Sequence, residues 1–478
     1  MNQSDMLPSH SLSSSSDIDW GKYEAKKYLH FDQPTPLTKE LKAKLLNPNW
    51  VIQHSFWPSI HFVIEFNKYV LKENYRELKL QGKSNKELRE KKIKKRDIYY
   101  SSHVDSYIYK YYGDVLNNHY NKYASNCGID ESIIAYRNNK KGKNTIDFCY
   151  EVFEKLFGYE EAIIISIDFT KYFDNINHSV LKKNIQEVLD VSKLEKDFYT
   201  VFKNLTKFTY VKKEDVSRFL IGKYGTDNTK ILRKEYNLKR IMTDEEFREF
   251  KKKYMYKHKK PYGIPQGSGM SAVCSNVHLI HFDQEIQRWV DGYGGLYRRY
   301  CDDIILIIPN KTTENWEEYR QQAFDIIKKY ENIGLKIQPE KTVVRLYENR
   351  LIKDTEGNLS QLDYLGFVTN GNEIRIREKS LFKYYSRAYR KAKKCKKSEL
   401  YFQKEGKTRL YGRRDLYRVY THLGRNYKKR GNFITYSNKA HMKMKNLAHV
   451  REQEKYPIES KIYRQIKRHW AKIQKRLK

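Results

Sequence analysis

Ala162-Ile163-Ile164-Ile165-Ser166-Ile167-Asp168 is a short apolar run, rich in β-branched residues, that ends on an acid. Such a run predicts a buried strand that is covered on at least one face. Farther along the chain, two apolar-alternating runs (296–300 and 304–308) flank Cys301-Asp302-Asp303, which predicts a β-hairpin with acids at its tip. If these strands are neighbours in an antiparallel sheet, three carboxylates from distant parts of the chain meet at one end of it.

A cluster of two or three carboxylates is what a nucleotidyl-transfer site would require of the protein. Joining nucleotides uses two divalent cations about 3.5–4 Å apart, and Mg²⁺ takes few carboxylates because water and phosphate oxygens complete its shell. Each signal alone is weak, because an Asp after a strand is usually a cap or turn residue and an Asp-Asp pair in a hairpin is usually part of the turn. The prediction of a metal site therefore depends on these signals occurring together and in this order.

The composition indicates a polyanionic partner. The 478 residues include 94 Lys and Arg against 58 Asp and Glu, a formal net charge of +36. Such a charge attracts nucleic acid, although a ribosome or an anionic membrane surface would also fit. The 41 Tyr could stack on unpaired bases, but an AT-rich coding sequence would enrich Lys and Tyr as well.

The cysteines and the apolar segments bear on location. Five isolated Cys without a CxxC pair argue against a zinc ribbon or a disulfide framework and fit a reducing cytosol. No apolar run approaches the roughly 20 residues that a membrane span needs, and the N-terminus lacks a signal-peptide pattern. We therefore expect a cytoplasmic protein with no membrane partner.

The predicted organisation has four parts and belongs to the α+β class, without internal repeats. Residues 1–20 form a disordered tail, 21–130 a helical N-terminal extension, 131–375 the central domain, and 376–478 a basic helical region. Within the extension, Lys86 to Arg96 is interpreted as a solvated helix face. Residues 205–260 are an insertion or connector. Further helices are predicted from Ile146 to Gly158, from His178 to Leu189, from Ser268 to Val290 and up to about Tyr330.

Five motifs in order resemble those of bacterial and group II intron reverse transcriptases, over about 137–367. They are Asp168-Phe169-Thr170-Lys171-Tyr172-Phe173-Asp174-Asn175-Ile176-Asn177-His178 (motif A), Gly263-Ile264-Pro265-Gln266-Gly267-Ser268 with Ser271, Asn276 and Asp283 (B), Arg299-Tyr300-Cys301-Asp302-Asp303 (C), Gly334-Leu335 with Pro339-Glu340-Lys341-Thr342 (D), and Tyr364-Leu365-Gly366-Phe367 (E). Cys301 stands where the family usually has Ala, and is small enough to fit. The resemblance implies a right-hand polymerase of fingers, palm and thumb, with a small antiparallel palm sheet backed by helices.

The resemblance also implies roles for single residues. Asp168, Asp302 and the backbone carbonyl of Phe169 would ligate two Mg²⁺ (or Mn²⁺) ions, and Asp303 would be a ligand or near-ligand. Lys341 would donate a proton to pyrophosphate, although a Lys beside an acid is more often an ordinary surface cation.

Further expected roles concern the incoming dNTP. Phe173, five residues after Asp168, would lie under the sugar and exclude a 2′-hydroxyl, unless it is simply a core residue. Gln266 and Gly267 would form a turn against the nucleotide and template, since Gly allows close approach. Arg137 and Lys143 are candidates for holding the triphosphate.

The family contains several subclasses. No paired Cys and His of an endonuclease are present, and about 110 residues follow motif E. The chain therefore looks most like the defence-associated and abortive-infection reverse transcriptases of bacteria, some of which pair with a structured non-coding RNA and some of which make untemplated DNA. A retron-like role, an intron maturase and a protein-primed polymerase remain alternatives, and homo-oligomers are compatible with the sequence.

The C-terminal region bears on the RNA partner. Clusters such as Lys391-Ala392-Lys393-Lys394-Cys395-Lys396-Lys397, Arg413-Arg414 and Lys428-Lys429-Arg430 alternate with Tyr. The resemblance makes this region the thumb, which grips the duplex of RNA template and DNA product. The excess charge predicts that it also binds a dedicated structured RNA, with steep salt dependence.

Two rival functions remain. A catalytically idle RNA-binding protein has no reason to cluster carboxylates that repel phosphate. An RNA-dependent RNA polymerase more often has Gly-Asp-Asp in motif C and a polar sugar pocket where Phe173 stands.

Overall fold

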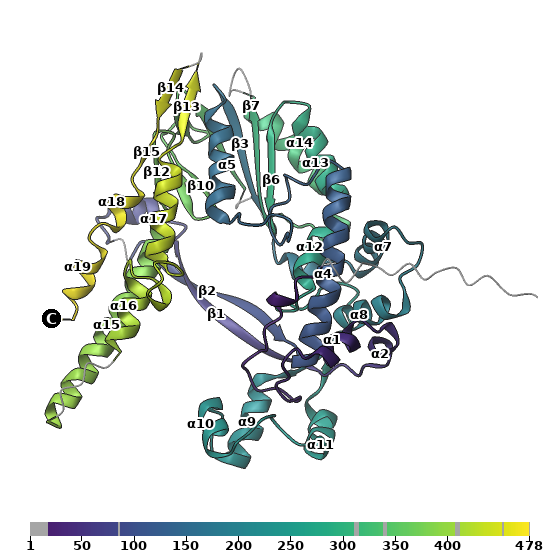
Figure 1. Ribbon diagram of the computed structural model, residues 1–478. Helices are drawn as coiled ribbons and strands as arrows, with labels where there is room; N and C mark the ends of the chain where they lie inside the picture. Colours follow the sequence, from purple (N-terminus) through teal and green to yellow (C-terminus); the bar gives the residue numbers. More distant parts are fainter. Residues whose placement is uncertain are drawn as a thin grey trace, which may run out of the picture.

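The centre of the molecule is a five-stranded, wholly antiparallel sheet, seen in a computed structural model that describes residues 18–84, 87–309, 315–337, 342–406, 412–451 and 454–477 (Figure 1). Its strand order is β6-β7-β3-β8-β9. The strands are β3 (Ala162–Asp168), β6 (Leu296–Tyr300), β7 (Asp303–Pro309), β8 (Val343–Glu348) and β9 (Leu351–Lys353). The buried strand and the acid-bearing hairpin expected from the sequence are confirmed.

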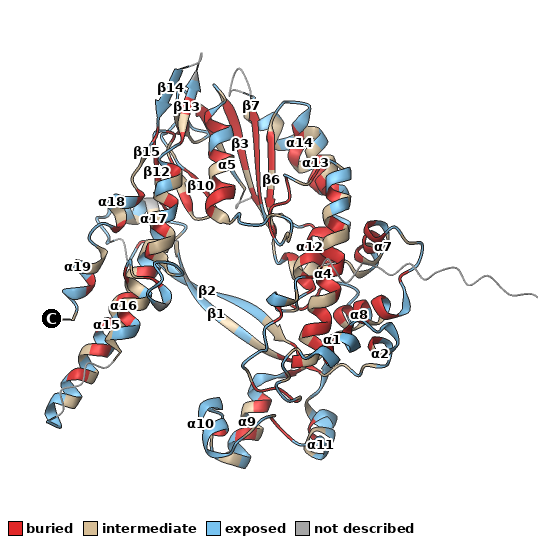
Figure 2. Ribbon diagram, viewed as in Figure 1, coloured by how far each residue is buried: buried red, intermediate tan, exposed pale blue. Residues whose placement is uncertain are grey.

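Helices cover both faces of this sheet because side chains alternate along each strand. Ile163 and Ile165 enter a core shared with α13 (Ile280–Asp291) and α14 (Trp316–Lys328). Ile164 enters a second core with α5 (Thr145–Phe157). Burial on both faces explains why β3 is almost uninterrupted apolar sequence (Figure 2).

The predicted helix from Ser268 to Val290 is two helices, α12 (Ser271–Val277) and α13, so a single helix was wrong. The chain breaks at His278-Leu279. Asn184 donates to the backbone oxygens of Val277 (3.1 Å) and His278 (3.0 Å), and thereby satisfies carbonyls that a continuous helix would have paired.

The largest correction concerns residues 59–71 and 89–100, which form a long β-hairpin instead of helix. Strand β1 (Ser59–Leu71) pairs with β2 (Arg89–Tyr100) from Ile60↔Tyr100 to Leu71↔Arg89, with the short helix α3 (Tyr75–Leu80) between them. Local charge density favoured a solvated helix, but cross-strand partners, such as the Lys95–Glu65 ion pair at 3.3 Å, come from elsewhere in the chain. The hairpin extends diagonally away from the long helix α4 (His103–Asn126) (Figure 1).

The segment 205–260 folds as a small lobe with its own core. Leu29 and Phe31 of the N-terminal segment pack into it, and β4 pairs in parallel with β1. Of the predicted tail, residues 1–17 lie outside the described residues, whereas Ile18 is buried against the main core. The lobe consists of β4 (Thr209–Lys212), α9 (Lys213–Tyr224), α10 (Thr229–Glu235), α11 (Asp244–Tyr254) and β5 (Tyr256–Lys257).

The C-terminal region is divided between two cores, so the expectation of one helical thumb over 376–478 was too simple. One part adds β15 to a second sheet, whose strand order is β10-β11-β12-β15. In the same part, α17 (Phe433–Met444) packs into the core that lies between α5 and the central sheet, which is the expected palm. The other part has its own small core. The strands of this sheet are β10 (Leu362–Tyr364), β11 (Phe367–Thr369), β12 (Glu373–Ile376) and β15 (Glu459–Ser460), and the thumb helices are α15 (Glu378–Lys404), α16 (Arg413–Tyr420), α18 (Ile462–Ile466) and α19 (His469–Gln474).

Across the parts of the chain that the structure describes, no helix combines the length and apolarity that crossing a membrane requires.

Candidate active site

Asp168 and Asp303 stand directly opposite each other at one end of the central sheet. They are the last pair in the register of β3 with β7. Asp302 precedes Asp303 in the hairpin turn, and its carbonyl oxygen accepts a hydrogen bond from the Phe169 N–H (3.3 Å). The three acids predicted from the sequence are therefore brought together from two segments more than 130 residues apart.

The acids repel one another. Burial among the surrounding groups, followed by the charges of Asp302 and Asp168, raises the pKa of Asp303 to about 6, while Arg377 opposes the shift. The Asp303 side chain still reaches solvent, so a ligand from solution can relieve the repulsion. A divalent cation is the species that this arrangement favours.

The donor set fits such cations only in part. Within the described residues, no three acid, His or Cys side chains converge as a ready-made metal cage. Mg²⁺ accepts an incomplete protein shell because it retains water and phosphate ligands. Phe169 could contribute only its backbone oxygen, because its ring is buried against Tyr172 and Phe282.

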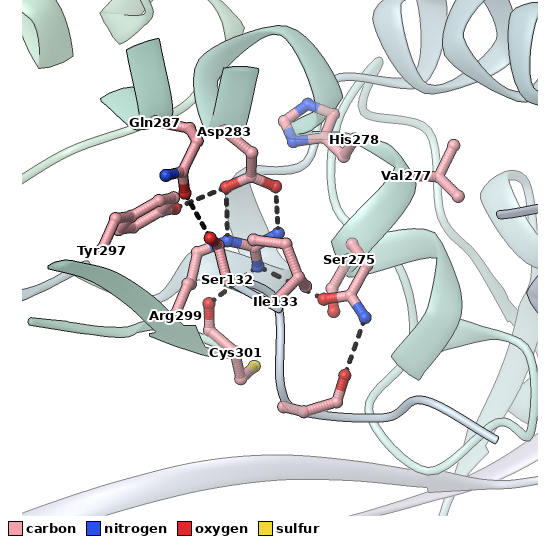
Figure 3. Close-up of polar contacts among 12 residues, drawn as sticks. Ser132, Ile133, Ser275, Val277, His278, Asp283, Gln287, Tyr297, Arg299 and Cys301 are labelled. Atoms are coloured by element: carbon pink, nitrogen blue, oxygen red, sulfur yellow. Dashed lines mark hydrogen bonds and ion pairs between the residues drawn. The ribbon is translucent and has the colours of Figure 1, made fainter. Parts of the chain in front are cut away.

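A buried ion pair that the sequence reasoning missed holds the tip of the hairpin (Figure 3). Arg299 is fully buried and binds Asp283 through two bonds, Nε to Oδ1 (2.7 Å) and Nη2 to Oδ2 (2.5 Å). Its Nη1 also donates to the carbonyl oxygen of Cys301 (3.1 Å), whose φ is +61°. Arg299 therefore fixes a strained residue directly before Asp302.

Other side chains complete this network. Tyr297 donates its hydroxyl to Asp283 (2.6 Å), and Asn276 accepts from Arg299 (3.3 Å) while donating to the carbonyl oxygen of Ala135 (2.9 Å). Asp283 and Asn276 were noticed only as part of motif B. No local signal marks the pair, because Arg299 adjoins Arg298 and Asp283 is followed by Gln284 and Glu285.

The turn around Gly267 receives the base of the long hairpin. The Tyr99 N–H donates to the Gln266 carbonyl oxygen (2.9 Å). Gly267 has φ +122°, and a Cβ there would overlap the Tyr99 carbonyl oxygen. A glycine is thus required, because the turn and β2 are in backbone contact.

Motif A lies against the same turn. The backbone oxygens of Phe173 and Ile176 accept from the Ile264 N–H (3.0 Å) and the Gly263 N–H (2.8 Å). The Phe173 ring is half-buried at the edge of the main core. Phe173, the candidate for the sugar contact, and the turn expected to lie against the nucleotide and template are therefore neighbours.

The triphosphate candidates are placed differently. The Arg137 side chain has no exposure, because it pairs with Asp130, donates to Asn121 (2.6 Å) and lies over the Tyr120 ring. Lys143 is partly exposed and pairs with Glu151 (2.7 Å). Lys341 lies outside the described residues. In this structure Arg137 stabilises its own loop. Its role in binding the triphosphate stays a prediction, and it would require Arg137 to give up its bonds to Asp130 and Asn121 for bonds to phosphate.

One protein family matches the part of the chain that carries these acids. Residues 129–369 match the family described as "Reverse transcriptase (RNA-dependent DNA polymerase)". No curated protein matches the chain. Among solved structures, the chain is similar to the apo telomerase of Candida tropicalis truncated from its C-terminal domain (13% identity, TM-score 0.38, 65% of this chain and 55% of that one) and to the Candida albicans telomerase with a TWJ fragment of telomeric RNA (13%, 0.35, 71% and 51%). The chain thus spans about half the length of these telomerases.

Proposed function

The chain belongs to the reverse transcriptase family, with its right-hand fold of fingers, palm and thumb, and we propose that it is an RNA-directed DNA polymerase. The observation that carries the proposal is the opposition of Asp168 and Asp303 beside Asp302, at the open end of the palm sheet. Two divalent cations, Mg²⁺ with Mn²⁺ as the alternative, would be held by these carboxylates and the Phe169 carbonyl. When bound, they supply charge neutralisation at the attacking 3′-hydroxyl and the leaving pyrophosphate.

The protein's own residues position the reactants. Asp168 and Asp303 lie on hydrogen-bonded strands, so their separation is fixed by the sheet, and Arg299 fixes the backbone that presents Asp302. The turn at Gln266 and Gly267, braced by Tyr99, would form one wall for the incoming dNTP. Lys341 remains the proposed proton donor to pyrophosphate, and Lys143 a proposed triphosphate contact.

Deoxynucleotides are the proposed substrates. Phe173 is next to that turn and would exclude a ribose 2′-hydroxyl. This ring supports a DNA polymerase over an RNA polymerase.

RNA is the proposed partner, as template and as a structured non-coding RNA on the basic thumb. The exposed cations of α15 and of the segment after α16 support it. A role in bacterial antiphage defence is supported by the length of the chain, its N-terminal extension and its basic C-terminal region, which resemble those of defence-associated enzymes. Five free thiols support a cytoplasmic location. An intron maturase and an untemplated or protein-primed polymerase are the alternatives.

Nucleotide incorporation tests the proposal. Purified protein is supplied with each dNTP separately, with each rNTP, and with or without its co-purified RNA. Wild-type protein should incorporate dNTPs in an RNA-dependent manner, and Asp302→Asn/Asp303→Asn should lose at least about 100-fold, the cost of several kcal/mol of transition-state stabilisation. Asp190→Asn, at an exposed left-handed helix cap that Asn tolerates, is the matched control.

The outcomes separate the candidates. Undiminished incorporation by the double variant would sink the proposal at its root. Incorporation without RNA indicates untemplated synthesis, and DNA that stays attached to denatured protein indicates protein priming. Loss of phage resistance in cells carrying the double variant, with resistance kept by Asp190→Asn, tests the defence role.

A further inference from the structure

The thumb contains a pocket of about 510 Å³ that lies apart from the residues described above. It opens between the first turns of α15, the end of α16 and the segment that leads into α17. Its main lining is Lys383, Arg387, Arg418 and Arg425 together with Tyr384, Tyr420, Phe433, Ser380 and Asn432. Its size is within the range of pockets that enclose one small ligand, about 300–1,000 Å³.

The pocket concentrates positive charge without a compensating acid in its wall. Lys383 and Arg387 are four residues apart on α15, where like charges disfavour the helix. Among the described residues these two and Arg425 have no ion-pair partner, and Arg418 has one, Asp415 at 3.0 Å, outside the lining. The buried Nε of Arg418 also lacks a hydrogen-bond partner in the described structure. An anion would relieve this repulsion.

Aromatic rings form another part of the wall and are held in place. Tyr384 stacks on Phe433 with 4.7 Å between ring centroids and donates its hydroxyl to the Tyr420 carbonyl oxygen (2.8 Å). Asn432 ties the two sides together by donating to the carbonyl oxygens of Arg418 (3.1 Å) and Thr421 (2.6 Å). Tyr420 and Phe433 are half-buried, so each still offers ring surface.

Backbone hydrogen bonds hold the loop that carries Arg425. The Arg425 N–H donates to the Arg430 carbonyl oxygen (2.6 Å), and the Lys429 N–H donates to that of Leu423 (2.7 Å). Gly424 has φ +73°, and a Cβ there would overlap the Arg430 backbone. The backbone that carries Arg425 is therefore fixed before any ligand arrives, which lowers the entropic cost of binding.

We propose that this pocket binds one unpaired nucleotide of a folded RNA. The cations would hold its phosphates and the rings of Tyr420 and Phe433 would stack on its base. A paired base cannot reach such a pocket, because its faces are covered within the helix; bases in loops and bulges can. The Ser380 hydroxyl also lines the pocket and would be within reach of a ribose 2′-hydroxyl.

The test uses full-length protein and three probes of equal length: an RNA stem-loop with an unpaired loop, a blunt RNA–DNA duplex, and a DNA stem-loop of the same sequence. Wild-type protein should favour the RNA stem-loop. Arg418→Gln/Arg425→Gln should weaken stem-loop binding at least about 10-fold and reduce the log-log salt slope by about 2. The duplex should be affected much less. Tyr420→Leu should weaken the stem-loop about 10-fold by loss of stacking.

A charge-matched pair controls for general electrostatics. Lys428→Gln/Arg430→Gln removes two exposed cations from the same loop, outside the lining. It should weaken all three probes equally and leave the preference for the RNA stem-loop intact. Equal loss of preference in both pairs, or equal weakening of the duplex by the pocket pair, contradicts the proposal.

Photocrosslinking gives a readout that does not depend on activity or on a folded variant. A 4-thiouridine in the loop should crosslink to peptides that contain Tyr420 or Phe433, and crosslinks confined to other segments would overturn the proposal. The pocket proposal rests on the RNA partner of the proposed function. The experiments must therefore be able to contradict the pocket and the polymerase activity independently. A crosslink without dNTP incorporation refutes the polymerase, whereas incorporation without the crosslink refutes the pocket.

Discussion

Asp168 faces Asp303 across two hydrogen-bonded strands. The backbone oxygen of Asp302, the residue before Asp303, accepts a hydrogen bond from the N–H of Phe169, the residue after Asp168. Two backbone segments thus fix the acids together before any cation or nucleotide is present. The cost of that fixed repulsion gives a measurable consequence in the metal-free protein.

The pH dependence of metal-free stability should reveal this cost. The pKa of Asp303 is about 6 in the fold against 3.8 ordinarily, so the folded state takes up a proton that the unfolded state has lost between those values. Charged Asp303 therefore destabilises the fold above about pH 6, and the penalty fades as pH falls toward 3.8. In EDTA, Asp303→Asn should raise the Tm at pH 8 and lose this advantage by pH 4, as measured by thermal denaturation.

Added Mg²⁺ should reverse the order of the Tm values of wild-type protein and Asp303→Asn at pH 8. Wild-type protein should gain stability at pH 8, because a ligand that binds only the folded state stabilises it, and Asp303→Asn should gain less. A Tm advantage of the variant that does not change with pH would contradict the assigned repulsion.

Removing the Arg299–Asp283 pair should show whether the pair positions the hairpin tip that carries Asp302 or only stabilises the fold. Arg299→Met leaves the Asp283 carboxylate buried without its cationic partner and the Cys301 carbonyl without its donor, and breaking such a buried pair costs about 3–5 kcal/mol. The double change Arg299→Met/Asp283→Leu removes both charges and should recover most of the stability. If Arg299 positions the hairpin tip, the stable double variant still has a low kcat with a nearly unchanged KM.

Full activity in that stable double variant would show that the pair is only structural. Unfolding by denaturant and steady-state nucleotide incorporation are the two measurements.

Shortening Phe173 should admit ribonucleotides. Phe173→Val leaves the backbone bond to Ile264 intact and opens space beside the turn, so incorporation of rNTPs relative to dNTPs should rise by on the order of 10- to 100-fold. Single-nucleotide extension with dATP and ATP measures the ratio. An unchanged ratio would make Phe173 a core residue, the alternative that its half-buried position also allows.

Adding a methyl group at Gly267 should uncouple the long hairpin from the palm. Gly267→Ala has to move the Tyr99 backbone, in addition to the roughly 1–2 kcal/mol that a left-handed backbone costs an L-residue. Gly357→Ala also has positive φ but meets nothing within 4 Å, so it reports the backbone cost alone. We expect Gly267→Ala to raise the KM for dNTPs strongly and Gly357→Ala to leave it unchanged.

The palm could be predicted because its signals are local. The five apolar residues among the six before Asp168, and the apolar-alternating runs around Cys301 to Asp303, specify buried strands whatever surrounds them. The motif order then indicated the family and the three acids. Lys86 to Arg96 misled for the opposite reason. Lys86 lies outside the described residues, and the strand residues from Arg89 to Arg96 depend on partners in β1 that lie 18–32 residues earlier.

By itself, then, the sequence determined which segments are buried and which acids stand at their ends, because burial follows from side-chain chemistry and from the period of the backbone. Only the tertiary structure decided that Arg299 and Asp283 meet, that Arg137 is enclosed, that the chain after Arg377 divides between palm and thumb, and that four thumb cations surround one pocket. Those outcomes depend on pairing between distant segments. A charged side chain is compatible with both solvent and a buried partner, and the fold alone determines which of the two it meets.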